Sequence, residues 1–236
     1  MRTKLGPVAA VATLAAVVTT LTSLPVLGGE AQLSSASAAS AAAARGTVQV
    51  RLRTAITNLP VARETRAGYD RDLFDHWVDA DGDCRDTRDE VLAAESLVAV
   101  HGCDVQSGKW RSWYDGAVTR DSTAFDVDHL VALAEAWDSG AKRWTADTRR
   151  RFANDLGDGR SLVAVSASSN RSKSDQDPAE WLPRYGKCRY LRHWVAVKIR
   201  WRLKVNATEK QALTDIASGC DNAELTVHRA SVETVG

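Results

Sequence analysis

Hydrophobic and polar side chains alternate along several short stretches of the chain, which is the pattern of β-strands. The runs at 125–131 and 161–165 predict two strands bounded by turn residues. Residues 109–116 alternate large and polar side chains up to an Asp-Gly pair, a hairpin turn signal in a β-rich part of the chain. A further strand and a short helix are expected within 48–62, and an amphipathic piece at 69–74.

Apolar residues recur at helical spacing between these strands. The spacing predicts helices at 88–100, 133–139, 146–153, 189–205 and 208–219. Thr145 is expected to cap one of them, and Thr87-x-x-Glu90 and Thr208-x-x-Gln211 are capping boxes for two others. The helix at 88–100 is expected to bury Leu97 and Val98. Strands and helices of this kind predict an α+β fold.

The first 38 residues have the features of a secretory signal peptide. Arg2 and Lys4 form a basic start, an apolar run extends from Val8 to about Leu27, and Ala36-Ser37-Ala38 is a cleavage site. A membrane anchor is the alternative, but the run is rich in Ala and Thr and ends in small residues. We therefore expect a secreted protein with no stable membrane association after cleavage.

The remaining chain is long enough for one well-packed domain. Residues 39–68 form an Ala-rich leader and N-terminal segment, residues 69–220 the main domain, and residues 221–236 a tail that looks unanchored. A monomer is expected.

Charge gives no argument for nucleic acid by itself. The chain carries 31 basic and 30 acidic side chains, and loss of Arg2, Lys4 and Glu30 with the signal leaves the two in balance. Any binding to an anionic polymer must therefore come from a local basic surface.

Four cysteines in an exported chain indicate two disulfides. Three connectivities are open, and we favour Cys84–Cys103 with Cys188–Cys220 because each closes a short loop around one helix. Zinc or free thiols are the alternative, but no Cys-x-x-Cys spacing supports a zinc site.

Asp128 and His129 stand side by side at the end of the strand predicted at 125–131. A carboxylate is a hard metal ligand, and a neutral imidazole accepts a proton readily near neutral pH. Neighbouring side chains on a strand point to opposite faces, so the two can act around one point only where the strand ends. A metal ion and a base together can make water attack a phosphodiester or an ester.

An acidic loop precedes the helix at 88–100. Asp79, Asp81 and Asp83 occupy positions one, three and five of a calcium loop, and Glu90 occupies position twelve. Cys84 stands where that loop requires glycine, and the capping box explains Glu90 without metal. We therefore favour an acidic turn that caps the helix, with calcium binding as the alternative.

Basic residues offer several candidate phosphate contacts. Arg88 lies at a helix start, where the helix dipole does not favour a cation. A basic stripe at helical spacing runs along the helix at 189–205, whose inner face carries Trp194 and Trp201. The stripe consists of Arg189, His193, Arg200 and Lys204. It fits a phosphate backbone or a solvated face equally well.

Several spaced motifs resemble one known family. They are 126–133 (DVDHLVAL), 137–140 (WDSG), 152–155 (FAND), 170–173 (NRSK) and 177–183 (DPAEWLP). Together they resemble exported HNH endonucleases related to the C-terminal domain of GmrSD-type restriction endonucleases. The resemblance covers roughly Tyr69 to Cys220 and implies a ββα-metal (HNH-like) core with surrounding helices.

The resemblance also implies roles for individual residues. His129 would be the general base, Asp128 and Asn170 would bind a divalent cation, and Lys173 would lie near the scissile phosphate. Arg149, Arg150, Arg171 and Lys173, with the basic stripe, are candidates for the nucleic-acid surface. Mg²⁺ or Mn²⁺ is expected first, and Ca²⁺ also suits oxygen ligands.

One position departs from the family pattern. The middle Asn of the motif often stands just before the Leu of the second strand, where this chain has Ser161 followed by Leu162. Asn154 lies earlier in the loop as a candidate substitute, although a helix C-cap explains it better. The departure concerns a residue that would brace the base rather than the base itself.

The sequence therefore predicts a secreted, metal-dependent endonuclease acting on DNA or RNA. The first rival is a calcium-dependent binding module built on the acidic loop. A second is an esterase, but the chain lacks a Gly-x-Ser-x-Gly nucleophile elbow. A third is a toxin that cleaves nucleic acid inside a neighbouring cell, which would use the same chemistry as the predicted endonuclease.

Overall fold

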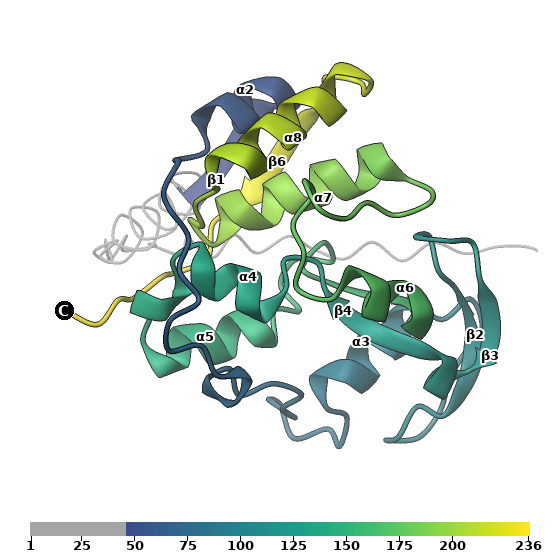
Figure 1. Ribbon diagram of the computed structural model, residues 1–236. Coiled ribbons are helices and arrows are strands. Elements are labelled where there is room, and N and C mark those ends of the chain that lie inside the picture. The colour runs from purple at the N-terminus through teal and green to yellow at the C-terminus, as the bar shows by residue number, and fades with distance from the viewer. Residues whose placement is uncertain (1–45) are drawn as a thin grey trace, which may run out of the picture. The chain divides into compact units, whose positions relative to one another are not determined.

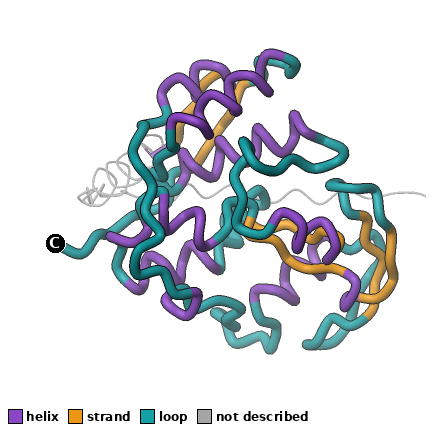
Figure 2. The backbone as a smooth tube through the Cα atoms, viewed as in Figure 1, coloured by secondary structure: helices purple, strands orange, loops and turns teal. Residues whose placement is uncertain are grey.

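The computed structural model describes residues 46–236, and it confirms the predicted α+β class (Figures 1 and 2). The elements in chain order are β1 (Thr47–Arg51), α2 (Leu52–Asn58), η1 (Arg71–Leu73), α3 (Thr87–Glu95), β2 (Ser107–Arg111), β3 (Val118–Asp121), η2 (Ser122–Ala124), β4 (Phe125–His129), α4 (Leu133–Asp138), η3 (Ala141–Arg143), α5 (Ala146–Ala153), β5 (Leu162–Ser166), α6 (Ala167–Lys173), α7 (Lys187–Arg200), α8 (Ala207–Ser218) and β6 (Glu224–His228). The predicted signal peptide at 1–38 lies outside the described residues. Within 46–236, no helix has both the length and the apolar character needed to cross a bilayer.

The strands form three separate antiparallel pairs: β1 with β6, β2 with β3, and β4 with β5. In the β4–β5 pair Val127 lies opposite Ala164, and Asp128 lies opposite Val163. Opposed residues share one face of an antiparallel pair, and successive residues alternate between faces. Asp128 and Val127 therefore project from opposite faces of this hairpin.

The β4–β5 hairpin separates two hydrophobic clusters. Val127 and Ala164 pack with Leu92 of α3 and Trp110 of β2 in the smaller cluster. On the other face, Val163 and Val165 join the main core, which also contains the inner faces of α4, α5, α7 and α8. Because both faces are covered, the polar residues of β4 lie in a largely apolar setting.

A second group of elements packs away from this hairpin. Figure 1 shows α2, α8, β1 and β6 together, with α7 beside them. The ammonium of Lys198 in α7 is fully buried between Glu135 of α4 and Glu209 of α8, with nitrogen–oxygen distances of 2.5 and 3.0 Å. This ion cluster ties three helices together, and burial raises the pKa of Glu209 to about 8.

The favoured disulfide pairing is confirmed. Cys84–Cys103 closes a loop that contains α3. Cys188–Cys220 joins the start of α7 to the chain just after the end of α8. Within residues 46–236 no cysteine is free.

The prediction of an unanchored tail after Asp221 is wrong. Residues 224–228 form β6, which pairs with β1, so Thr47 lies opposite His228. Leu225 and Val227 are buried, at 4% and 0% exposure. The pairing joins residues about 180 positions apart, which a local pattern cannot reveal.

Two helix ends also differ from the prediction. The helix predicted at 88–100 ends at Glu95, because Ser96 turns extended and Leu97 donates its N–H to the Lys109 carbonyl in β2. Leu97 and Val98 are consequently exposed rather than buried. The helix predicted at 189–205 ends at Arg200, since Arg202 takes a left-handed conformation with φ 53°.

Two predicted caps are wrong by one or two positions. The side chain of Asp86, not Thr87, accepts the capping hydrogen bond of α3, from the N–H of Asp89. Asn206, not Thr208, caps α8. The cap predicted for α5 at Thr145 is confirmed.

Truncating Val227 to alanine tests the anchoring of β6. Removal of two buried methyl groups is expected to lower the free energy of unfolding by about 2 kcal/mol, measured by chemical denaturation. Thr226→Ala, at the exposed neighbouring position, is the control and is expected to change little. Equal stability of the two variants would show that β6 is not part of the cooperative fold.

Glu95 makes stability depend on pH. Burial raises the pKa of its carboxyl to about 7, so the native state retains a proton that the unfolded chain releases near its ordinary value of 4.5. This contribution is complete below about pH 4.5 and is lost as the pH rises through 7. Between pH 5 and 8 the free energy of unfolding is expected to fall by about 2–3 kcal/mol. The glutamine of Glu95→Gln cannot ionise, so this fall is expected to be absent in the variant. Parallel pH dependence of unfolding in both proteins would contradict this assignment.

Candidate active site

A cavity of about 370 Å³ opens beside the end of β4. Three consecutive β4 residues, 127–129, line it, together with the start of α4 and the end of α6. Its remaining wall comes from residues 69–71, far earlier in the chain. The cavity therefore gathers Asp128, His129 and Asn170, which the sequence singled out for catalysis and metal binding.

His129 is the last residue of β4, and its imidazole is fixed by one hydrogen bond. The ring is 6% exposed and lies against Trp77 at 5.2 Å between ring centroids, with Phe152 at 6.5 Å. Its Nε2 lies 2.8 Å from the carbonyl oxygen of Ala153, at the end of α5. A carbonyl can only accept, so Nε2 carries the proton and Nδ1 is the accepting nitrogen.

The surroundings of His129 keep its imidazole neutral. Burial lowers the pKa to about 3, opposed by the Ala153 carbonyl and assisted by the positive charge of Arg71. A neutral ring with an unprotonated Nδ1 is the form that a general base requires.

Asp128 is buried and held by two donors. The hydroxyl of Tyr114 donates to Oδ2 at 2.6 Å, and the ammonium of Lys173 donates to Oδ1 at 2.8 Å. Burial raises the pKa of Asp128, while Lys173 and Tyr114 act in the opposite direction. The carboxylate is thus set in one orientation from both sides.

Lys173 is fully buried and does not line the cavity. Besides Asp128, its ammonium donates to the carbonyl of His129 at 3.1 Å. The sequence placed Lys173 near a scissile phosphate. The structure instead places it behind Asp128 and His129, where it joins α6 to the end of β4.

Asn170 lies in the middle of α6, which begins after a Ser166 cap. Its side-chain amide donates to Oδ2 of Asp126 at 3.1 Å. Because the amide nitrogen is engaged with Asp126, the carbonyl oxygen is the atom of this side chain that remains to ligate a metal ion at the cavity wall. Arg171 also approaches Asp126, at 3.9 Å.

The donor atoms at this cavity suit a hard divalent cation. Asp128 offers carboxylate oxygens that retain lone pairs beyond those used by Tyr114 and Lys173, and Asn170 offers an uncharged oxygen. Asp126, next to Asn170, is a third oxygen donor close by. A small number of protein ligands leaves coordination positions for water and phosphate.

Asn154 and Ser161 support the site from outside the cavity. Asn154 accepts from the N–H of Val78 and donates to the Asp75 carbonyl, which fastens the 75–78 segment next to Ala153. The Ser161 hydroxyl donates to buried Asp155, and the Ser161 carbonyl accepts from the N–H of Leu130. Both residues therefore brace the loop around His129 through hydrogen bonds to neighbouring segments.

Of the predicted phosphate contacts, only Arg171 lines the cavity. Arg88 donates to the carbonyls of Ser122 and Phe125. Arg189 lies 4.5 Å over the ring of Trp113, and Arg200 is largely buried in an ion pair with Asp155. Arg189 and Arg200 of the predicted basic stripe are therefore engaged in separate contacts within the protein.

Sequence reasoning gave no role to four residues that shape the site. They are Tyr69, Arg71, Tyr114 and Asp126. Asp126 belongs to the family-like motif, and its i, i+2 spacing from Asp128 was a usable signal that both lie on one face. Tyr69, Arg71 and Tyr114 reach the site through folding of distant segments and gave no such signal.

Two acidic clusters elsewhere deserve comparison with this cavity. The carboxylate oxygens of Asp79, Asp81 and Asp83 lie within 4.8 Å of one another and are exposed. They accept hydrogen bonds from the loop's own N–H groups, including those of Gly82 and Cys84. The second cluster, Glu64, Glu135 and Glu209, surrounds the ammonium of Lys198, which supplies the compensating charge.

Comparison with known proteins gives one family match and one relative. Residues 101–216 match the model of the C-terminal domain of GmrSD restriction endonucleases. An uncharacterized secreted protein of Arthroderma benhamiae is 43% identical over 157 residues, which cover 65% of this chain and 76% of that protein. No solved structure matches. The secreted relative and the two disulfides confirm the predicted secreted location.

Lys173→Met tests the buried ion pair. The substitution leaves the carboxylate of Asp128 buried without its counter-charge, so the free energy of unfolding is expected to fall by about 3–5 kcal/mol. Adding Asp128→Asn removes the stranded charge and is expected to recover part of this loss.

Chemical denaturation of the single and double variants measures both effects. Lys187→Met, at an exposed position at the start of α7, is the matched control and is expected to be neutral. A Lys173→Met protein as stable as this control would contradict the assigned pairing.

Proposed function

The chain belongs to the family of GmrSD restriction endonuclease C-terminal domains, and on this premise we propose that it is a secreted, metal-dependent endonuclease. The reaction is hydrolysis of phosphodiester bonds in DNA, with RNA as the second substrate to test. The site is the cavity at the end of β4.

The observation that carries this proposal is the orientation of His129. Its Nε2 is committed to the Ala153 carbonyl, so the ring cannot turn without losing that bond, and Nδ1 remains the proton acceptor. The same cavity is lined by Asp128 and Asn170, the oxygen donors. A fixed base beside oxygen ligands is the arrangement needed to activate a water molecule.

The local fold supports the assignment of a ββα-metal core. β4 and β5 form an antiparallel pair, and α6 follows β5 directly. Asp128 and His129 come from the first strand, and Asn170 from the helix, in the order that the family resemblance implies. We propose that these elements are that core.

We propose Asp128 and Asn170 as the protein ligands of the cation, with Mg²⁺ or Mn²⁺ expected first. A bound divalent cation would stabilise the negative charge that develops on the scissile phosphate. Asn170 suits this role because its carbonyl adds no charge that would repel the substrate. Asp126 positions Asn170 by holding its amide nitrogen.

The other side chains then have defined roles. His129 takes a proton from the attacking water at Nδ1, and the Ala153 carbonyl stabilises the resulting imidazolium through Nε2. Tyr114 and Lys173 keep Asp128 ionised and oriented. We therefore propose a positioning role for Lys173 in place of the phosphate contact that the family resemblance implies.

Substrate binding is expected to depend on salt. The chain carries only a small formal charge, so the affinity for a polyanion must arise from local cations such as Arg171 at the cavity. Counterion release then makes the affinity fall as the salt concentration rises.

Cleavage of supercoiled plasmid by the mature chain tests this function. Nicking is expected with Mg²⁺ or Mn²⁺ and is expected to stop in EDTA. His129→Ala is expected to lower the rate at least about 100-fold, because a positioned general base contributes that much.

His101→Ala is the matched control, since His101 is exposed and lies in a loop outside the cavity. Cleavage by His129→Ala at the rate of the control would rule out the assigned base. A chain that cleaves neither DNA nor RNA with any divalent ion, but loses calcium-dependent binding in Asp81→Ala, would favour the rival binding module.

A further inference from the structure

One wall of the cavity comes from a segment outside the region that matches the family. We call residues 61–74 the crossing segment. It leaves α2, runs past α4 and reaches the cavity at residues 69–71 (Figure 1). The family match covers 101–216, so the crossing segment lies outside the matched residues.

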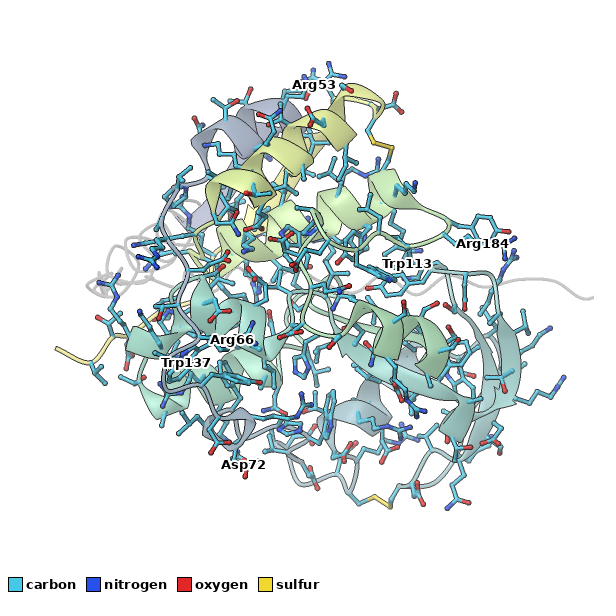
Figure 3. The ribbon with its side chains drawn as sticks, viewed as in Figure 1. Arg53, Arg66, Asp72, Trp113, Trp137 and Arg184 are labelled. Atoms are coloured by element: carbon cyan, nitrogen blue, oxygen red, sulfur yellow. A yellow bond between two sulfur atoms is a disulfide. The ribbon has the colours of Figure 1, made fainter. Side chains whose placement is uncertain are left out.

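The crossing segment is tied down along its whole length. The N–H of Ala62 donates to the carbonyl of Val205 at 2.9 Å. Arg66 forms ion pairs with Asp138 at the end of α4 and Asp175 after α6, at 2.7 and 2.5 Å. Figure 3 shows Arg66 and Trp137 together where the segment passes α4. The wall it provides is therefore fixed.

The far end of the segment is anchored by a buried ring. Phe74 is fully buried and packs against Trp137 and Phe152. Arg149 of α5 donates to the Leu73 carbonyl at 3.1 Å. Arg71 stands between these anchors and the Arg66 ion pairs, at the start of η1, so its backbone is held while its side chain is exposed.

Within the described residues, Arg71 differs from the other arginines around the cavity in having no carboxylate partner. Arg66 is paired with Asp138 and Asp175, and Arg171 approaches Asp126. Among residues 46–236, the side chain of Arg71 contacts two neutral groups, the imidazole of His76, at 3.4 Å from Nη2 to Nε2, and the hydroxyl of Tyr69. Its guanidinium thus keeps hydrogen-bond donors for an outside acceptor.

We propose that Arg71 binds a phosphate oxygen of the nucleic-acid substrate in the cavity, which rests on the proposed function above. The residue lines the same cavity as His129 and Asn170. Its planar guanidinium presents paired donors that match two oxygens of a phosphate group.

Arg71 would then serve the reaction in two ways. It orients the scissile phosphate relative to Nδ1 of His129, and it stabilises the charge that develops on the phosphate during attack. The crossing segment is in this sense part of the active site, and the strand–strand–helix unit is incomplete without it.

The test compares Arg71→Ala and Arg71→Gln with Arg63→Ala in plasmid cleavage by the mature, disulfide-bonded chain. Arg63 is an exposed arginine of the same segment that does not line the cavity. Loss of one charge-stabilising donor is expected to lower kcat/KM by about 10²–10³-fold in both Arg71 variants. Arg63→Ala is expected to stay within about twofold of the unsubstituted chain.

A binding measurement separates phosphate contact from a structural role. In the inactive His129→Ala background, adding Arg71→Gln is expected to weaken binding of a short DNA duplex. It is also expected to reduce the slope of log Kd against log salt by about one, because one fewer phosphate is neutralised. Adding Arg63→Ala instead is expected to leave that slope unchanged, and thermal melting checks that all variants fold.

The outcomes distinguish this inference from the function on which it rests. Cleavage that is lost in His129→Ala but unchanged in both Arg71 variants, with an unchanged salt slope, overturns the role of Arg71 alone. No cleavage by the unsubstituted chain overturns the proposed function and the role of Arg71 with it.

Discussion

The buried ion pair between Asp128 and Lys173 is the constraint on which the site depends. It joins the only two elements that carry the proposed metal ligands, β4 and α6, at a nitrogen–oxygen distance of 2.8 Å. A buried pair of this kind is costly to form and still more costly to break, because either partner alone would be an uncompensated charge. The pair therefore specifies how α6 lies on the hairpin, and with it the distance from Asn170 to His129.

The second constraint is a single backbone carbonyl. Ala153 ends α5, and its oxygen sets the tautomer and the orientation of His129. Asn154 and Ser161 stand at the two ends of the loop that connects α5 to β5, and their side-chain hydrogen bonds hold this loop in place. The hairpin carries the proposed base, α6 carries a proposed ligand, and the end of α5 fixes the ring, so the proposed site is built from short-range parts. The crossing segment adds a wall from outside this unit, together with Arg71, a cation that has no carboxylate partner among residues 46–236.

Much of this arrangement could be predicted from the sequence because its signals are local. Alternation located the strand at 125–131, a short apolar run located the strand at 161–165, and a capping residue located α5 at Thr145. Export and cysteine spacing led to the correct disulfides. The burial of Lys173 could not be predicted, since a lysine on a short helix carries no mark of the carboxylate it will meet. The β1–β6 pairing and the approach of Arg71 likewise depend on contacts between segments far apart in the chain.

The central claim is that Nδ1 of His129 is the accepting nitrogen of the site. Nitrogen-15 NMR of the mature chain, labelled in the histidine rings and assigned with His129→Ala, reports directly which ring nitrogen carries the proton. The account predicts a neutral ring at pH 7 with the proton on Nε2 and an unprotonated Nδ1. A ring protonated on Nδ1 would contradict the hydrogen bond to Ala153 and remove the proposed base.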